Sequence, residues 1–317
     1  MITLKAVAAE AGVSIRTVTR MLKNEPGGNA ETYKRVSAVA RRLGYVPNIA
    51  ARNLKIQRSN MVGLVVAARG NPMRTRIRTE LQQRLESAGK HFISGTVSDQ
   101  EPLLIDMLRE WSGLVHDVVF VAWPHACRPA RVLAGLPVRG VFVDCLDDPA
   151  YDVVEIDRTA GIREGVERLI KTGRRRIARC GPNIMNRRAG FNAAFEGRPG
   201  ARPEKHEVAT PGIDYQDGYD AGPAIVKRGI DAVFFETDAL AFGFYKYAYE
   251  QGLRVPEDVA VVGFNDTPAA GYACPPLSSV ALPIEAMAEQ VLAMIMTPGS
   301  TPRHITLPTR FVRRESA

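Results

Sequence analysis

The chain has 317 residues, of which 45% are hydrophobic and 24% are charged, and this composition indicates a globular protein with two or three domains. No stretch reaches the ~18 apolar residues of a membrane span and the first residues lack the apolar core of an export signal, so we expect a cytoplasmic protein without a membrane partner. The cysteines are far apart and the histidines are not clustered, which indicates no metal site and buried, reduced thiols at Cys127, Cys145, Cys180 and Cys274.

The excess positive charge lies at the N-terminal end. Residues 1–58 contain eleven lysines and arginines but three acidic residues, a net charge of +8, whereas the remainder contains 31 basic and 31 acidic residues. A merely solvated surface has no reason to segregate charge in this way. The segregation therefore predicts a polyanionic partner for this end of the chain.

The first local pattern is a short helix, a tight turn and a second helix. Val7, Ala8 and Ala11 place small apolar groups on one helical face. Gly12 then ends the helix, because glycine enters a left-handed turn without steric cost, and Ser14 can cap the next helix. This spacing is typical of a helix-turn-helix. The alternative, an ordinary helical hairpin, is disfavoured by the charge of the segment.

The second helix of this pattern has one apolar and one polar face. Val18 and Leu22 form the apolar face, which packs inward. The opposite face points outward, where its side chains can read bases in a DNA major groove. Its members are Ile15, Arg16, Thr19 and Arg20.

A third helix and a short connecting segment follow. Asn29 can cap this helix and Gly44 ends it, with an apolar stripe between them at Val36, Ala40 and Leu43.

The connecting segment runs from Tyr45 to Lys55. Its helix-compatible part is too short to be stable alone, since isolated helices are marginal below ~12–15 residues. We expect it to order only when DNA and a partner chain hold it, with Leu54 suited to insertion into a minor groove; a plain linker is the alternative.

From Met61 onward, apolar strand-like runs alternate with helical stretches. This alternation predicts parallel sheets covered by helices on both faces, and its length of some 260 residues predicts two lobes with a ligand cleft between them. Helices are expected at 80–89, 162–171 and 239–251. The expected strands are 61–66, 118–122, 138–143, 177–180, 232–235 and 259–264.

The chain resembles the lactose/galactose repressor family of bacterial transcription regulators from end to end. In the N-terminal part the resemblance rests on Thr3-Leu4, Val7-Ala8, Ala11-Gly-Val-Ser14, Thr17-Val18, Arg20, Gly44-Tyr-Val-Pro-Asn48, Ala51 and Leu54. In the remainder it rests on Arg187-Arg-Ala-Gly-Phe191, Val262-Gly-Phe-Asn-Asp266, Pro275-Pro-Leu277 and the closing segment 307–316.

The resemblance implies an α/β fold with an all-α headpiece and a two-lobed core similar to periplasmic binding proteins. The expected parts are a helix-turn-helix headpiece (1–46), a hinge helix or linker (47–58) and an effector-binding and dimerisation core (59–317). Within the core, the expected N-lobe comprises about 59–170 and 283–307, and the C-lobe about 171–282 and 308–317.

The resemblance further implies a regulator, most simply a repressor, that binds a pseudo-palindromic operator in double-stranded DNA as a homodimer. A small-molecule effector, a sugar or a sugar derivative, modulates that binding from the cleft. The implied DNA-binding residues are Thr3, Ser14, Ile15, Arg16, Thr17, Thr19, Arg20, Asn48, Ala51 and Leu54. The implied effector-binding residues are Asn71, Trp123, Arg187, Thr237 and Asn265.

Several residues depart from the family pattern. Lys5 leaves a phosphate contact there unassigned, Asn265 stands at a common cleft acid, Thr237 is shorter than the usual asparagine, and Arg174 replaces a frequent histidine. The segment 69–76 is expected to be an unusually basic loop. It either faces solvent or favours an acidic or phosphorylated sugar, and both interpretations remain open.

Two other classes of function were weighed against this one. A solute-binding protein would share the core but would need an export signal and no headpiece. An enzyme would need a nucleophile–base pair, a phosphate-cradling loop or a ligand cluster, and no such motif is present. We therefore expect no catalytic residues, no cofactor and no metal. Asp147, Asp148 and Asp157 are expected to serve as loop, capping or cleft groups. Without a leucine heptad near the end of the sequence, the assembly should stop at a dimer.

Overall fold

The computed structural model describes residues 2–22, 29–45, 60–67, 72–97, 101–121, 129–144, 150–182, 187–197 and 207–317. The chain forms two compact units, residues 1–58 and residues 59–317, which we call the N-terminal unit and the core unit.

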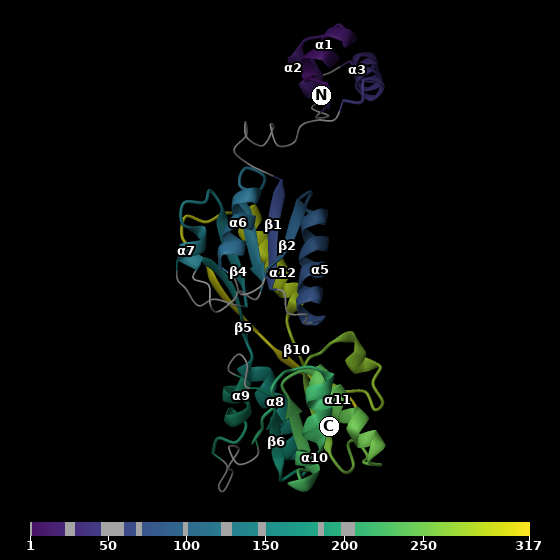
Figure 1. The fold of residues 1–317 in the computed structure, drawn as a ribbon, viewed down its shortest axis with the longest axis vertical. Helices are drawn as coiled ribbons and strands as arrows, with labels where there is room; N and C mark the ends of the chain where they lie inside the picture. Colours follow the sequence, from purple (N-terminus) through teal and green to yellow (C-terminus); the bar gives the residue numbers. More distant parts are fainter. Residues whose placement is uncertain are drawn as a thin grey trace. The chain divides into compact units, whose positions relative to one another are not determined.

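The N-terminal unit consists of α1 (Leu4–Ala11), α2 (Ile15–Leu22) and α3 (Ala30–Arg42), as the sequence predicts (Figure 1). Gly12 adopts φ 62° at the end of α1, and Ser14 accepts a hydrogen bond from the Thr17 amide at 3.1 Å. The three helices bury a small core of their own. Its buried members are Val7, Ala8, Ala11, Val18, Met21, Val36, Val39 and Ala40.

The first lobe of the core unit is a parallel sheet with strand order β11-β5-β4-β3-β1-β2. Its strands are β1 (Met61–Ala67), β2 (His91–Val97), β3 (Asp117–Val121), β4 (Arg139–Val143), β5 (Asp152–Asp157) and β11 (His304–Pro308). One face packs against α5 (Pro72–Ser87) and α12 (Ile284–Met296), the other against α6 (Glu101–Trp111) and α7 (Pro129–Leu133) (Figure 1).

The second lobe is a sheet with strand order β12-β10-β9-β8-β6-β7, in which β12 pairs antiparallel with β10 and the other pairs are parallel. Its strands are β6 (Ile177–Cys180), β7 (Glu207–Val208), β8 (Ala232–Phe235), β9 (Ala260–Asn265), β10 (Ser278–Ala281) and β12 (Arg310–Val312). Its helices are α8 (Thr159–Lys171), α9 (Arg187–Ala193), α10 (Tyr215–Lys227), α11 (Asp238–Glu250) and the 3-10 turn η2 (Pro268–Gly271).

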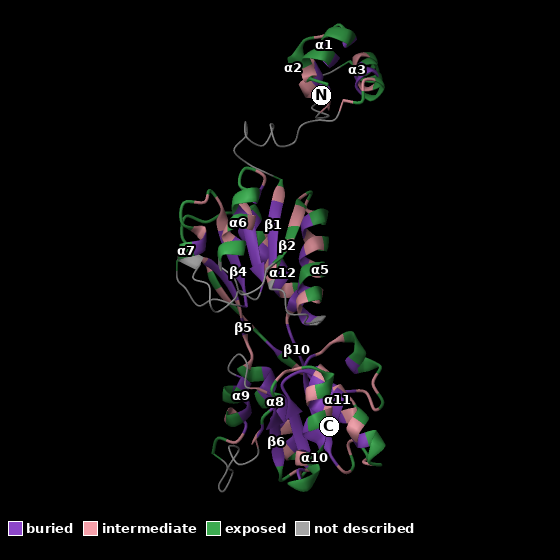
Figure 2. Ribbon diagram, in the orientation of Figure 1, coloured by how far each residue is buried: buried purple, intermediate pink, exposed green. Residues whose placement is uncertain are grey.

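The central strands of both sheets are almost entirely buried, which explains the apolar runs in the sequence (Figure 2). The chain passes between the lobes after β5, after β10 and after β11. Helix α8 packs against α9, β10 and β12 of the second lobe. The first lobe therefore ends before Thr159, and α8 belongs to the second lobe. The expected boundary near residue 170 lies too far along the chain.

Two further expectations need correction. The basic segment 69–76 was expected to be a loop, but residues from Pro72 onward form the first turns of α5, because proline is compatible with the start of a helix. Cys274 was expected to be buried, yet it is an exposed free thiol in the turn before β10, whereas Cys180 is buried as expected.

Candidate functional site

The outward face of α2 is the candidate DNA interface. Ile15 is 48% exposed and Arg16 is also exposed, whereas Thr19 and Arg20 are partly covered. The Thr19 hydroxyl donates to the Ile15 carbonyl at 2.9 Å, and the Thr17 hydroxyl lies 2.9 Å from the Ser14 hydroxyl. Ile15 and Arg16 are thus the side chains of α2 that local hydrogen bonds leave most available to a partner.

The predicted DNA-binding residues outside this face have other positions. Thr3 caps α1, accepting a hydrogen bond from the Ala6 amide at 3.3 Å. Asn48, Ala51 and Leu54 lie outside the described residues, as do Asn71 and Trp123 of the predicted effector site. The six exposed lysines and arginines of the described headpiece give it a basic surface: Lys5, Arg16, Lys34, Arg35, Arg41 and Arg42.

Arg187 lies inside the core unit, at the start of α9. Its side chain is 5% exposed, donates a hydrogen bond to the Glu236 carbonyl, and places its guanidinium carbon 4.1 Å from the centre of the Phe264 ring. Its Nε has no hydrogen-bond partner. Burial, and then the nearby Arg158 guanidinium, lower the pKa of Arg187 to about 10, because both disfavour the cation.

Asn265 is the last residue of β9, and Thr237 lies two residues after the neighbouring strand β8. Both are therefore at the carboxyl ends of strands in the second sheet, and Arg187 follows β6 at the same end. Thr237 caps α11: its hydroxyl accepts from the Leu240 amide at 3.1 Å and donates to the Ile213 carbonyl at 2.9 Å. Asn265 is 4% exposed, adopts φ 109°, and its Oδ1 has no partner. Asn265 thus retains a free acceptor, whereas the only hydroxyl proton of Thr237 is already used.

Two buried carboxyl groups that the sequence analysis did not single out complete this cluster. Asp144 follows β4, and both its oxygens accept from Arg158, the residue after β5. Burial raises the pKa of Asp144 even beside this guanidinium.

Asp238 opens α11 and accepts from the Ser279 hydroxyl and the Thr267 amide, each at 2.6 Å. Burial raises its pKa to about 6.

The cluster lies where the two lobes meet. Asp144 and Arg158 stand at the carboxyl ends of β4 and β5 in the first sheet, and Asn265 ends β9 in the second. Arg76 of α5 donates to the Asp266 carbonyl at 2.8 Å, so a hydrogen bond joins the lobes beside the cluster. Carboxyl ends of parallel strands are the common ligand-binding edge of such sheets.

Asp157 and Arg174 have structural roles instead. Asp157 accepts from the Thr159 amide at 2.8 Å, just before the first turn of α8; Asp147 and Asp148 lie outside the described residues. Arg174 donates to the carbonyls of Asp231, Pro256 and Glu257 and fixes the loop before β9.

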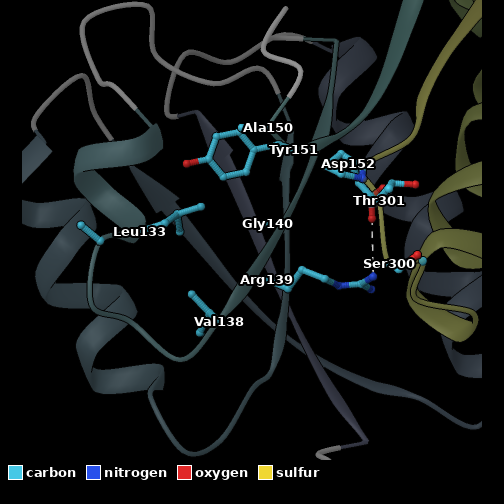
Figure 3. Close-up of a pocket in the computed structure, with 12 residues that line it drawn as sticks. Leu133, Val138, Arg139, Gly140, Ala150, Tyr151, Asp152, Ser300 and Thr301 are labelled. Atoms are coloured by element: carbon cyan, nitrogen blue, oxygen red, sulfur yellow. Dashed lines mark hydrogen bonds and ion pairs between the residues drawn. The ribbon is translucent and has the colours of Figure 1, made fainter.

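A cavity of about 490 Å³ lies at the opposite end of the strands of the first sheet, beside the amino ends of β4 and β5 (Figure 3). Arg139, Tyr151, Asp152, Ser300 and Thr301 are among its lining residues. Of the predicted effector-binding residues that the structure describes, Arg187, Thr237 and Asn265, none lines it. The polar cluster at the carboxyl ends, not this cavity, is therefore the candidate effector site.

Fold and site together define a DNA-binding headpiece joined to a two-lobed ligand-binding core. Residues 3–48 match the model of the bacterial regulatory proteins, lacI family, and residues 166–317 match the periplasmic binding protein-like domain. The chain is 31% identical to the HTH-type transcriptional regulator CelR of Thermobifida fusca over 99% of this chain and 98% of that protein. The protein belongs to the lacI family of bacterial transcriptional regulators.

Solved structures show the same fold. The structure of the transcriptional regulator CelR–cellobiose complex has a TM-score of 0.70 at 28% identity and is covered in full by this chain. The Lac repressor dimer bound to operator and the anti-inducer ONPF has a TM-score of 0.84 at 22% identity, covering 99% of this chain and 98% of that one. The similar proteins are regulators and not enzymes.

Among the described residues, no helix has the length and apolarity needed to cross a membrane. Within the same residues, no group of three or more His, Cys, Asp or Glu side chains is placed to hold a metal ion.

Proposed function

We propose that this regulator is a cytoplasmic repressor that binds a pseudo-palindromic operator as a homodimer, and that a sugar or sugar derivative in the interlobe cluster modulates this binding. The observation that carries the proposal is the pairing of two features in one chain. The N-terminal unit exposes a basic recognition helix, and the core unit holds buried, incompletely paired polar groups where its lobes meet. The similar regulator that was solved with cellobiose supports a sugar as the effector.

Within this proposal, Ile15 and Arg16 distinguish operator bases. Arg16, which is exposed on α2, is proposed to donate two hydrogen bonds to a guanine, a contact that contributes about 1–3 kcal/mol of discrimination. In the core, Arg187 and Asn265 contact the effector, Thr237 holds the start of α11 in place, and Asn71 and Trp123 remain proposed members. The hinge, including Leu54, is proposed to transmit lobe movement to the headpiece.

The test begins with selection of a preferred duplex from random DNA by the full-length protein. Fluorescence anisotropy then measures binding to that duplex and to a scrambled one over a range of salt concentrations. We expect the log–log salt dependence to have a slope of about −0.9 per neutralised phosphate. Light scattering of the complex should show two chains per duplex.

Arg16→Ala should lower affinity for the selected duplex far more than for the scrambled one. Arg109→Ala is the matched control, because Arg109 is a 66% exposed arginine of α6 in the core unit. Salt-independent binding, or equal effects of the two variants on the selected duplex, would contradict the proposal.

A further inference from the structure

We propose that the effector is an anion bearing hydroxyl groups, such as a sugar acid, and that its negative group pairs with Arg187. This inference rests on the proposed function, because it assigns a ligand class to the same interlobe cluster.

Arg187 differs from the neighbouring buried arginines in its partners. Arg158 is paired with Asp144, and Arg179 is paired with Glu236 and Glu207. Among the described residues, the direct contacts of Arg187 are a backbone carbonyl and an aromatic ring. The carboxylates of Glu236, Asp144 and Asp238 act on it electrostatically without an ion-pair contact, and each of them is engaged by another group. A buried cation that lacks a directly paired anion favours a ligand that supplies one.

The carboxylates of the cluster are already engaged. Both oxygens of Asp144 accept from Arg158, those of Asp238 accept from Ser279 and Thr267, and Asp266 is paired with Arg314 at 2.7 Å. The buried atoms that have no partner include the Nε donors of Arg158 and Arg187 and the acceptor Oδ1 of Asn265. The unused groups are mainly donors, and a ligand rich in acceptors, such as a carboxylate or phosphate, satisfies them.

The charges around the cluster are also unequal. Among the described residues, five arginines converge there against three aspartates, beside the Arg179–Glu236 ion pair: Arg74, Arg76, Arg158, Arg187 and Arg314 against Asp144, Asp238 and Asp266. Arg74 and Arg76 come from the first turns of α5, where the structure has a helix in place of the expected basic loop. Arg76 reaches the second lobe from there, since it donates to the Asp266 carbonyl. The local excess of positive charge favours an anion, while Asn265 Oδ1 can accept a hydrogen bond from a ligand hydroxyl.

The test compares acids with their neutral counterparts by thermal shift and calorimetry on the full chain at fixed ionic strength. The pairs are D-glucuronate with D-glucose, D-galacturonate with D-galactose, D-gluconate with D-sorbitol, and glucose 6-phosphate with glucose. Sodium sulfate serves as a probe that carries charge without a sugar. We expect at least one acid to bind at least tenfold more tightly than its partner, and sulfate to raise the melting temperature of the wild type more than that of Arg187→Met.

Arg187→Gln is the second variant, and Arg188→Gln is the control, because Arg188 is the exposed next residue and pairs with Glu207. The tighter binding of the acid and the rise in melting temperature caused by sulfate should disappear in both Arg187 variants and persist in Arg188→Gln. If a neutral sugar binds in an Arg187-dependent way and its acid does not, the charge inference is wrong while the site stands. If neither an acid nor sulfate distinguishes wild type from Arg187→Met, the inference is overturned. If an acid binds but leaves operator affinity unchanged, the inference stands and the proposed coupling fails.

Discussion

Arg179 and Glu236 form an ion pair inside the second lobe, with side chains that are 3% and 0% exposed. Arg179 lies on β6 and Glu236 follows β8, so the pair joins adjacent strands, and the Glu236 carbonyl accepts the hydrogen bond from Arg187. The pair thus fixes the backbone that holds Arg187, the arginine of the proposed effector site.

Removing one partner of this pair should strongly destabilise the core unit. Arg179→Met removes the ion-pair partner of the buried Glu236 carboxylate and should lower the free energy of unfolding by about 3–5 kcal/mol. Urea unfolding followed by tryptophan fluorescence measures this, because both tryptophans, Trp111 and Trp123, belong to the core unit. The double variant Arg179→Met/Glu236→Met should be less unstable than the sum of the single variants; strict additivity would argue against a coupled pair.

Asp238 should make stability depend on pH in the acidic range. Its pKa in the folded protein is about 6, above the ordinary value of 3.8, so the folded state keeps its proton at pH values where the unfolded state has lost it. The contribution of Asp238 to the free energy of unfolding is therefore fully present below about pH 4 and is lost as the pH rises to 6. The loss is about 3 kcal/mol, because each unit of difference in pKa corresponds to roughly 1.4 kcal/mol.

The comparison that isolates this effect is Asp238→Asn, which cannot titrate. Between pH 4 and pH 6 the wild type should lose stability relative to the variant, as measured by urea unfolding at each pH. The difference in the free energy of unfolding between wild type and Asp238→Asn at any single pH is less informative. It also contains the loss of a hydrogen bond, since asparagine can accept from only one of the two donors, Ser279 and Thr267. A constant difference across this pH range would contradict a raised pKa.

Ser14 offers a way to separate headpiece stability from DNA contact. Ser14→Ala removes the cap of α2 and should cost about 1 kcal/mol, seen as faster hydrogen exchange in peptides covering residues 2–22. Ser14→Asp keeps a capping oxygen but adds a negative charge. It should restore slow exchange while weakening DNA binding, provided that Ser14 faces the phosphates. Wild-type affinity in Ser14→Asp would remove Ser14 from the predicted interface.

The two described cysteines should differ in reactivity. Burial, followed by the nearby Glu236 carboxylate, raises the pKa of Cys180 to about 12, so about one thiol in ten thousand is ionised at pH 8. Cys274 is exposed. Iodoacetamide at pH 8 should label Cys274 in the folded protein and Cys180 only after unfolding, as peptide mass spectrometry can show. Rapid labelling of Cys180 in the folded state would indicate opening of the second lobe.

The sequence predicted the strands that are buried on both faces and missed those of mixed polarity. β3, β4, β6, β8 and β9 are mainly apolar, with Arg179 as the charged exception in β6, and each lies within its sheet. The edge strands β2 and β11 mix polar and apolar residues and are only partly buried, so their apolar signal is weak.

The site was predicted only in part, because its groups come together through the fold. Arg187 and Asn265 are predicted from the family resemblance alone, and the structure shows that both are buried at the carboxyl ends of strands in the second sheet. Asp144 is identified as a member of the cluster through its ion pair with Arg158. The two residues meet because they follow the paired strands β4 and β5. No local pattern marks such a pair. Thr237 was predicted as a ligand-binding residue from its position, but its hydrogen bonds show a cap, a role that depends on where α11 begins.

The order of the segments has a consequence for synthesis on the ribosome. The headpiece core uses only residues within 4–45, so it can assemble as soon as that segment emerges. Each sheet of the core unit, in contrast, takes its last strand from beyond residue 303, since β11 and β12 end the chain. A nascent or prematurely terminated chain would therefore carry a finished DNA-binding surface before either lobe is complete. Such a fragment would carry the recognition helix without the core that, in the proposed function, dimerises and responds to the effector.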